Sequence, residues 1–300
     1  MDFFVKFWGT RGSIPTPGYR TQKYGGNTPC VEIRCGEKLL ICDGGSGLRE
    51  LGLDLIGRKG KKITGHMFFS HTHWDHIQGF PFFVPAYIPE NTFYVYCPNP
   101  GDTRVYELLS GQMNSDYFPV NFSELSAHIL ARDMQNRSTG IDGVEVKAMP
   151  LNHPGGAVGY SFETDEHKVV YASDNELDSI LNNCKEALVR SEVHRDVPDE
   201  YVGFARGADL LIADGQYTDQ EYPDKVGWGH SRATTLVDWA VRAGVKQLAV
   251  SHHDPLQTDD DVHAKISACR ERAARLGSDL VVFGARESLE LRISQGKLRG

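Results

Sequence analysis

The sequence predicts an α/β fold in which two β-sheets form one domain with helices outside them. Three observations support this interpretation. Residues 1–45 contain strand-like apolar runs separated by Gly- and Pro-rich turns, and the second half alternates short apolar runs with helical stretches. The chain of 300 residues is 40% hydrophobic, which is enough to bury a sizeable core. No internal repeat or linker divides it, so we expect residues 1–300 to form a single domain.

The first half of the chain begins with strands. Apolar runs bounded by turn residues predict strands over 3–9, 30–36 and 38–45. A helix is expected over 46–57, where leucines recur at helical spacing. The next run, 62–70 (KITGHMFFS), predicts a buried strand that ends directly before His71.

The segment at about 86–135 predicts an excursion that lies near the active site rather than a second domain. It holds one strand signal, FYVYC, followed by mixed helical and aromatic stretches. Two interpretations of the nearby aromatic residues stay open: a small core under the excursion, or a pocket on which a base stacks. The residues concerned are Phe80, Phe82, Phe83, Tyr87, Tyr117 and Phe118.

The second half of the chain alternates strand and helix. Short apolar runs predict strands that end near residues 153, 174, 216, 253 and 285. Helical stretches lie between the later ones, over 233–244 and 261–277. This order is typical of an α/β domain.

Composition narrows the classes of function. The 32 Lys and Arg against 40 Asp and Glu give a net charge of -8, so the surface as a whole is not suited to holding nucleic acid. No long apolar run or export signal is visible, and we expect a cytoplasmic protein with no membrane contact. The six cysteines form no CxxC pair, which favours buried free thiols over disulfides or a cysteine zinc site.

The strongest signal is the segment from Ser70 to His76, SHTHWDH, which follows a buried strand. In an extended stretch His71 and His73 point to the same side, so both imidazoles can reach one cation. Asp75 and His76 follow as the chain turns, and are candidates to hold a second cation. Four potential ligands in so short a segment indicate a metal site rather than a solvated loop.

Three further candidate ligands follow other apolar runs: His153, Asp174 and His252. Loops at the carboxyl ends of strands converge on one edge of a sheet, so these side chains are expected to meet the histidine segment. Any one of these residues taken alone would be interpreted as an ordinary surface residue. Together with the histidine segment, the three indicate a metal site. Seven nitrogen and oxygen ligands without thiolate suit two divalent metal ions, Zn²⁺ or Mn²⁺, with Fe also compatible.

This pattern of histidines and aspartates resembles the metallo-β-lactamase superfamily over most of the chain. The resemblance implies an αββα sandwich. It also implies the ligand sets: His71, His73 and His153 for the first metal, Asp75, His76 and His252 for the second, and Asp174 bridging both. His252 rather than its neighbour His253 is the expected ligand, because Asp254-Pro255 follows it as in the family pattern.

Three weaker features resemble the tRNase Z and PhnP-like phosphodiesterase branch: the opening GTRGSIP, the Asp43-Gly-Gly turn, and Gly229-His230-Ser231. The chain departs from tRNase Z where that family has His-Glu-Ala-Thr, because it reads Ala213-Asp214-Gly-Gln. It also lacks a Gly- and Lys-rich arm for tRNA, and a cysteine cluster for the structural zinc of PhnP-like enzymes.

The resemblance implies a catalytic arrangement. A hydroxide that bridges the two metal ions is the expected nucleophile, and Asp75 can also orient it. His230, supported by Asp214, is the candidate that protonates the leaving alkoxide, although a loop histidine that caps the following helix is an equal alternative. Asp43 is a candidate partner for a ligating histidine. Arg11, Ser13 and Asn27 are candidates to contact phosphate or a nucleobase, although such loops are more often only turns.

We therefore expect a metal-dependent hydrolase that cleaves phosphodiesters in small-molecule substrates such as cyclic nucleotides. The alternatives are a thioester or lactone hydrolase of the same fold, a ribonuclease related to tRNase Z, and a non-catalytic metal sensor. Nucleic acid is an unexpected partner because the net charge is acidic. A homodimer is compatible with the family's habit but untested by the sequence.

Overall fold

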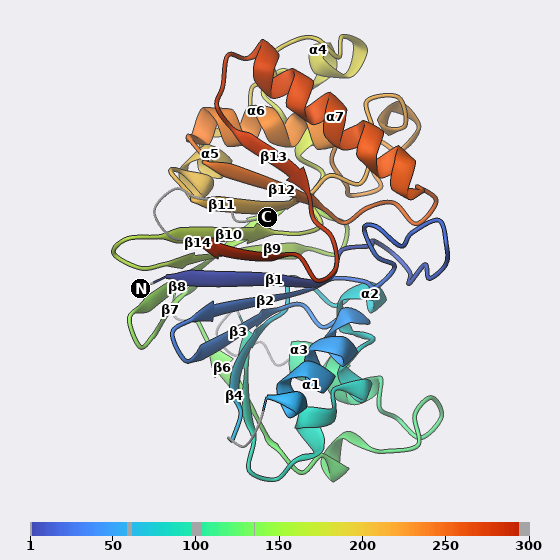
Figure 1. The fold of residues 1–300 in the computed structure, drawn as a ribbon, viewed down its shortest axis with the longest axis vertical. Helices are drawn as coiled ribbons and strands as arrows, with labels where there is room; N and C mark the ends of the chain where they lie inside the picture. Colours follow the sequence, from blue (N-terminus) through green and yellow to red (C-terminus); the bar gives the residue numbers. More distant parts are fainter. Residues whose placement is uncertain (1, 59–61, 98–103, 135, 294–300) are drawn as a thin grey trace.

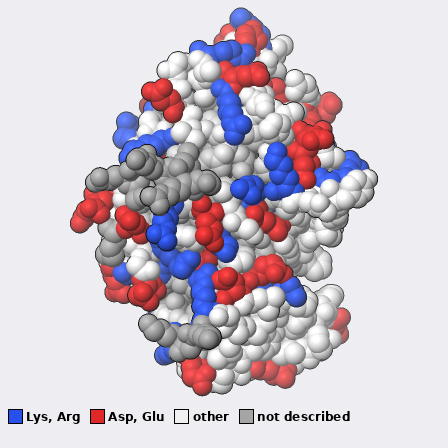
Figure 2. All heavy atoms as spheres, in the orientation of Figure 1, with Lys and Arg blue, Asp and Glu red and all other residues white. Residues whose placement is uncertain are grey.

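The computed structural model describes residues 2–58, 62–97, 104–134 and 136–293. Within these residues the strands form two seven-stranded mixed sheets, with helices on the outer side of each (Figure 1). The α/β class and the αββα sandwich are therefore confirmed. Acidic and basic side chains are interspersed on the face seen in Figure 2.

The first sheet has the order β14-β1-β2-β3-β4-β5-β6. Neighbours from β14 to β3 are antiparallel, and those from β3 to β6 are parallel. Because β3 and β4 are parallel, Asp43 and His71, which follow them, lie at the same edge. The strands are β1 (Phe3–Gly9), β2 (Cys30–Cys35), β3 (Lys38–Cys42), β4 (Thr64–Phe68), β5 (Thr92–Cys97), β6 (His128–Asp133) and β14 (Glu290–Ile293).

The second sheet has the order β13-β12-β11-β10-β9-β8-β7. Its strands β10 to β13 are parallel, whereas β7 to β10 are antiparallel. The carboxyl ends of β8, β10, β11 and β12 consequently share one edge. The strands are β7 (Ser138–Ile141), β8 (Val144–Leu151), β9 (Ala157–Glu163), β10 (Lys168–Ala172), β11 (Leu210–Asp214), β12 (Gln247–Ser251) and β13 (Val281–Gly284).

Three apolar layers hold these elements together. Residues such as Phe7, Phe68 and Phe162 pack between the sheets. A second layer packs α5, α6 and α7 on the second sheet, and a third packs α1 and α3 on the first (Figure 1). The α-helices are α1 (Gly47–Gly57), α2 (Trp74–Ile77), α3 (Arg104–Gly111), α4 (Cys184–Val189), α5 (Asp199–Ala205), α6 (Ala233–Ala243) and α7 (Asp259–Arg275). Short 3-10 helices are η1 (Phe80–Phe82), η2 (Val84–Tyr87), η3 (Phe122–Glu124), η4 (Leu177–Ile180) and η5 (Tyr222–Asp224).

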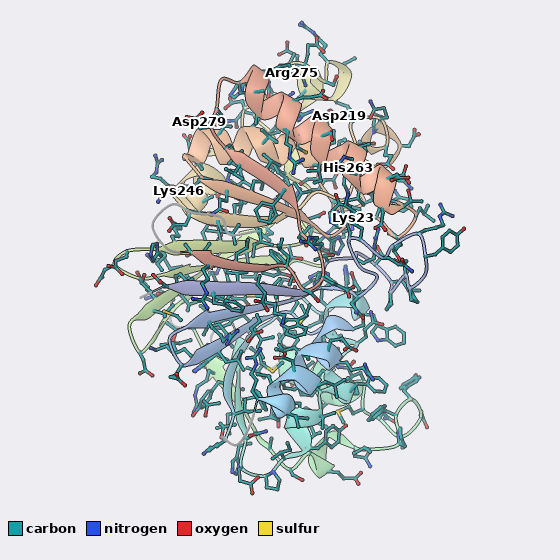
Figure 3. The ribbon with its side chains drawn as sticks, in the orientation of Figure 1. Lys23, Asp219, Lys246, His263, Arg275 and Asp279 are labelled. Atoms are coloured by element: carbon teal, nitrogen blue, oxygen red, sulfur yellow. The ribbon has the colours of Figure 1, made fainter. Side chains whose placement is uncertain are left out.

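The start of α7 is tied to the N-terminal loop. Thr258 caps the helix by accepting from the Asp261 amide, so the helix begins at Asp259, two residues before the range expected from the sequence. The carboxylate of Asp259 accepts from the amides of Lys23 and Tyr24, and Lys23 Nζ lies 3.4 Å from Nδ1 of the exposed His263 (Figure 3). This loop is thereby held beside the edge where the strands end.

The segment at about 86–135 was expected to be an excursion near the active site, but part of it belongs to the first sheet, which its strands β5 and β6 extend. Residues 98–103 and 135 of this segment lie outside the described part. Phe80 and Phe83 are fully buried in the third apolar layer, whereas Phe82 and Tyr117 are exposed.

Free thiols are found at Cys30, Cys35, Cys42, Cys184 and Cys269. Among the described helices, none has the length and apolar character needed to cross a bilayer.

Candidate metal centre

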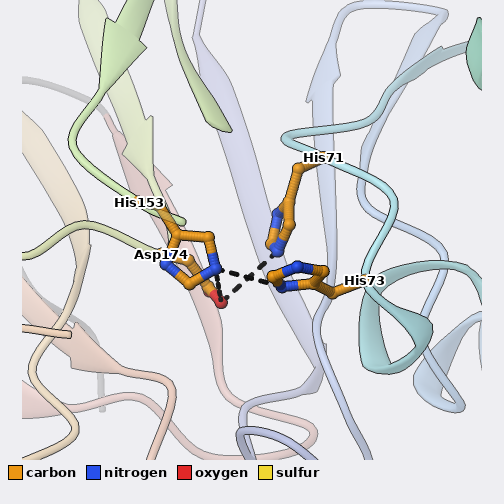
Figure 4. Close-up of side chains that lie close together, drawn as sticks. All are labelled: His71, His73, His153 and Asp174. Carbon is orange, nitrogen blue, oxygen red and sulfur yellow. Dashed lines mark hydrogen bonds and ion pairs between the residues drawn. The ribbon is translucent and has the colours of Figure 1, made fainter. Parts of the chain in front are cut away.

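The structure brings the seven candidate ligands to one edge, where the strands of both sheets end. These seven residues fall into two overlapping groups with ligand atoms within 4.8 Å of one another, and a third group that meets the same limit adds Asp214 and His230 to Asp174 and His252. The first group is His71, His73, His153 and Asp174 (Figure 4), and the second is Asp75, His76, Asp174 and His252. The division into two groups is the one that the family resemblance implies, while the role of each residue as a ligand stays a prediction.

Asp174 lies between the two groups and turns one oxygen toward each. Its Oδ2 is 3.6 Å from His71 Nε2 and 3.7 Å from His153 Nε2. Its Oδ1 is 3.2 Å from His76 Nε2 and 3.1 Å from His252 Nε2. The carboxylate is thus placed so that it can contact two cations at once.

Four of the five histidines have Nδ1 against a partner outside the cluster. His71 Nδ1 lies 3.0 Å from Ser70 Oγ, and His76 Nδ1 lies 2.8 Å from Asp43 Oδ2. His153 Nδ1 lies 2.8 Å from the Gly229 carbonyl, and His252 Nδ1 lies 3.0 Å from Gln216 Oε1. When Nδ1 donates to such an acceptor, the Nε2 lone pair is free to face a metal.

His73 is oriented differently from the other four histidines, and it is exposed. Its Nδ1 faces the cluster, 3.0 Å from His153 Nε2. His73 precedes α2, which carries Asp75 and His76. The extended backbone at His73, followed by one short helix, therefore presents three candidate ligands within four residues.

Backbone in the left-handed region occurs at three non-glycine residues around the centre. Asp43, Ser13 and His252 have φ values of 59°, 65° and 56°. Such conformations cost free energy and are often found at functional sites. At Ser13 the turn aims the backbone amide at Asp75 Oδ2, 2.8 Å away, and this fixes the carboxylate.

The donor set fits divalent cations. His71 Nε2 is buried and has no hydrogen-bond partner within the described structure, which is costly unless a cation takes its lone pair. Burial raises the pKa of the Asp174 carboxyl, but its imidazole neighbours His252, His76 and His71 outweigh this effect and hold the pKa well below its usual range. Imidazole nitrogens and ionised carboxylates without thiolate suit Zn²⁺, Mn²⁺ or Fe.

Next to the two groups, His230 pairs with Asp214. His230 Nδ1 lies 2.9 Å from Asp214 Oδ2 and 4.0 Å from Asp174 Oδ2. Burial alone would lower the pKa of His230, but the charge and hydrogen bond of Asp214 raise it to about 9. The helix α6 begins only at Ala233, with Arg232 as its N-cap, so His230 does not cap it. The imidazole is therefore held beside the cluster, with its Nδ1 paired to a carboxylate.

The geometry separates His252 from His253 and shows where Arg11 lies. His252 faces the cluster, whereas His253 is buried and its Nε2 lies 2.9 Å from the Ala285 carbonyl. Of the two interpretations of the loop at Arg11, the structure favours a turn over a phosphate contact, because Arg11 is fully buried. Its guanidinium donates to the carbonyls of Gly25, Asp254 and Gln257, and so clamps loops together.

Asn27 also serves the packing of loops. Its amide donates to Glu287, and its side-chain carbonyl accepts from Ser46 Oγ. Asp43 meets its expected neighbour, since it accepts from Ser70 and from Tyr171 as well as facing His76. This buried carboxylate is thus surrounded by donors.

Several supporting residues are not visible from sequence alone. Gln216 and Glu176 act on the centre through contacts between loops far apart in the chain. Gly12 and Gly229 leave room for histidine rings: a Cβ would lie 2.5 Å from His252 Cε1 at Gly12, and 2.4 Å from His153 Nδ1 at Gly229. Gly12, Gln216 and Gly229 each lie in a stretch that the sequence singled out, but their contacts with the histidines become visible only in the structure.

Comparison with known proteins places these features in context. Residues 61–253 match the family model described as a beta-lactamase superfamily domain. A relative named Ribonuclease Z from Haloarcula marismortui is 25% identical, and the alignment covers 84% of this chain and 86% of the relative.

Two solved structures share the fold. The metallo-beta-lactamase fold protein YhfI from Bacillus subtilis has a TM-score of 0.68 at 17% identity, covering 97% of this chain and 99% of that one. A diphosphatase from the PhnP family has a TM-score of 0.65 at 17% identity, covering 96% and 97%. At these identities the likeness supports the architecture.

Proposed function

The chain belongs to the beta-lactamase superfamily, and from this membership we propose that it is a dinuclear metal-dependent phosphodiesterase that acts on small substrates such as cyclic nucleotides. The observation that carries the proposal is the placement of Asp174 between two groups of candidate ligands, with one oxygen toward each. Such a pair of sites suits the in-line displacement at phosphorus that phosphodiester cleavage requires.

In this proposal His71, His73 and His153 hold one metal ion, and Asp75, His76 and His252 hold the other, with Asp174 shared. When bound, the two ions lower the pKa of a shared water and offset negative charge on the phosphate. The chain's own residues fix the ligands, because Asp43, Gln216 and the Gly229 carbonyl orient histidines from outside.

His230 is proposed to protonate the leaving oxygen of the substrate. A pKa of about 9 keeps its imidazole protonated at neutral pH. With Nδ1 held by Asp214, the proton that is transferred resides on Nε2. Asp214 then stabilises the charged imidazole and fixes its orientation, and does not contact the substrate.

Two candidate functions, cleavage of small phosphodiesters and cleavage of RNA, differ in the size of the substrate. A net charge of -8 and the mixture of charges on the face in Figure 2 favour a small substrate over long RNA. The relative named Ribonuclease Z favours the second candidate, a ribonuclease. Because Ala213 and Asp214 stand where tRNase Z has His and Glu, we give priority to the small substrate.

The experiment is a substrate panel with protein loaded with Zn²⁺ or Mn²⁺. The panel contains bis(p-nitrophenyl) phosphate, 2',3'- and 3',5'-cyclic nucleotides, and a tRNA precursor. The proposal expects cleavage of the small diesters and its loss in Asp75→Ala. Preferential cleavage of the tRNA precursor, with binding that weakens steeply with salt, would favour the ribonuclease. Cleavage of thioesters or lactones alone would overturn both.

A further inference from the structure

The two exposed tryptophans of the chain both adjoin the candidate metal centre. Trp8 and Trp239 are buried, whereas Trp74 and Trp228 are 73% and 58% exposed. Trp74 directly follows His73, and Trp228 directly precedes Gly229, whose carbonyl meets His153. Exposure alone does not distinguish them, since Tyr19 and Tyr117 are 83% and 82% exposed; what the two tryptophans share is a position directly beside residues of the candidate centre.

The loop that carries Trp228 is held firmly in place by Glu176. This buried carboxylate accepts from the amides of Gly227 and Gly229, at 2.7 and 3.0 Å, and from the Tyr222 hydroxyl at 2.7 Å. Both glycines have positive φ, 86° and 89°, which L-residues rarely adopt. The backbone on each side of Trp228 is therefore fixed while its indole extends into solvent.

One face of the indole is already occupied. Lys225 Nζ lies 3.9 Å from the centre of the Trp228 ring, in a cation–π contact. This contact limits the rotation of the indole, and a ring that is still 58% exposed has surface left for a second partner. A pre-positioned ring loses little conformational entropy when a flat group stacks on it.

The same loops link Trp228 to the centre. Asp174 and Glu176 belong to one turn after β10, so that turn supplies a carboxylate to the cluster and another to the Trp228 loop. The Gly229 carbonyl in turn lies 2.8 Å from His153 Nδ1. The distance from Trp228 to the centre is thus set by short, hydrogen-bonded connections rather than by a free loop.

We propose that the open face of Trp228 is a binding subsite for a flat aromatic group of the substrate, in the first instance a nucleobase, while the phosphodiester lies at the candidate metal centre. The proposal deepens the proposed function and rests on it for the position of the phosphate. Stacking on an aromatic side chain tolerates every base, so the subsite selects nucleotides without selecting one base.

The first test is kinetic and uses a matched pair of substrates: 2',3'-cyclic AMP and 1-O-methylribose 2',3'-cyclic phosphate, which lacks the base. Trp228→Ala should raise KM for the nucleotide about tenfold or more and leave the baseless substrate unchanged. Trp228→Phe should retain much of the effect and Trp228→Leu should lose it. Equal KM changes for both substrates, or none for either, would overturn the subsite.

The second test measures binding and does not depend on hydrolysis. Adenosine 5'-monophosphate is titrated into Zn²⁺-loaded protein while tryptophan fluorescence is recorded. Quenching should persist in Trp74→Phe and disappear in Trp228→Phe, with bound metal and melting temperature unchanged in both. Quenching that follows Trp74 instead, or that is absent from the parent protein, would refute the assignment to Trp228.

These tests separate the two proposals. If the substrate panel shows no phosphodiester cleavage, the proposed function fails, but adenosine 5'-monophosphate must still quench Trp228 for the subsite to stand. If phosphodiesters are cleaved and Trp228→Ala changes KM equally for the nucleotide and for the substrate without a base, the proposed function stands and the proposed subsite is wrong.

Discussion

The backbone carbonyl of Gly229 lies 2.8 Å from Nδ1 of His153, and a Cβ at Gly229 would lie only 2.4 Å from the same nitrogen. Position 229 needs glycine for two reasons: a side chain would collide with the His153 ring, and the backbone φ of 89° is one that residues other than glycine rarely adopt. One residue therefore both orients a candidate ligand and allows the loop to approach it closely.

Gly229→Ala should displace His153 and lower metal affinity by about 10- to 100-fold, the usual effect of disturbing an outer partner of a ligand. Titration calorimetry with Zn²⁺ measures this. Gly203→Ala is the matched control, because a Cβ there meets nothing within 4 Å and the residue is exposed in α5. Unchanged metal affinity in Gly229→Ala would mean that His153 is not a ligand.

Gln216 is predicted to support the second group of candidate ligands through Nδ1 of His252, 3.0 Å from its Oε1. Gln216→Leu removes the acceptor and should weaken binding of one metal ion by about 10- to 100-fold. Gln216→Glu keeps an acceptor for His252 but loses the amide that donates to Asp254 Oδ2 at 3.1 Å, so it should retain more metal than Gln216→Leu without matching the parent protein. The metal content of dialysed protein distinguishes the variants; equal loss in both would point to packing rather than to the hydrogen bond.

The pH dependence of the reaction tests the role of His230. Although burial lowers its pKa, Asp214 raises it to about 9, so the imidazole is protonated below that pH and loses its proton above it. The rate should therefore fall as the pH rises through about 9. Asp214→Asn removes the charge that raises the pKa, so this fall should move to lower pH. A pH profile unchanged by Asp214→Asn would exclude His230 as the proton donor.

A substitution at Asp238, which lies outside the candidate metal centre, should lower the stability of the fold. This fully buried carboxylate accepts from the Arg195 amide at 2.8 Å and from Arg272 Nη2 at 2.9 Å. Asp238→Ala leaves buried arginine charge unpaired and should lower the free energy of unfolding by about 3–5 kcal/mol. Urea denaturation measures this change. Loss of metal binding by the folded variant would show that the network also shapes the centre.

The candidate ligands could be predicted from sequence because their signal is local. His71 to His76 lie together in the chain, and His153, Asp174 and His252 each follow an apolar run that ends at the shared edge. The supporting residues could not be predicted in this way. Glu176 and Gln216 reach the centre through contacts with residues 53 and 36 positions away, which only the packed loops reveal.

The same reason explains why the role of Arg11 was left open by the sequence. A basic residue in a Gly-rich loop is compatible with phosphate binding, but in the fold Arg11 is buried against three carbonyls from two segments of the chain, those of Gly25, Asp254 and Gln257. Strands β6, β7 and β14 were also not predicted. Each is short, and burial along β6 does not alternate clearly, so sheet pairing rather than local pattern defines it.

The most direct test of the central claim is stepwise reconstitution of metal-free protein with Zn²⁺ or Mn²⁺, followed by hydrolysis of bis(p-nitrophenyl) phosphate. Activity should require about two equivalents of metal, and Asp174→Ala should abolish both the binding of the second equivalent and the activity. Protein that holds two metal ions and cleaves no phosphodiester would contradict this claim.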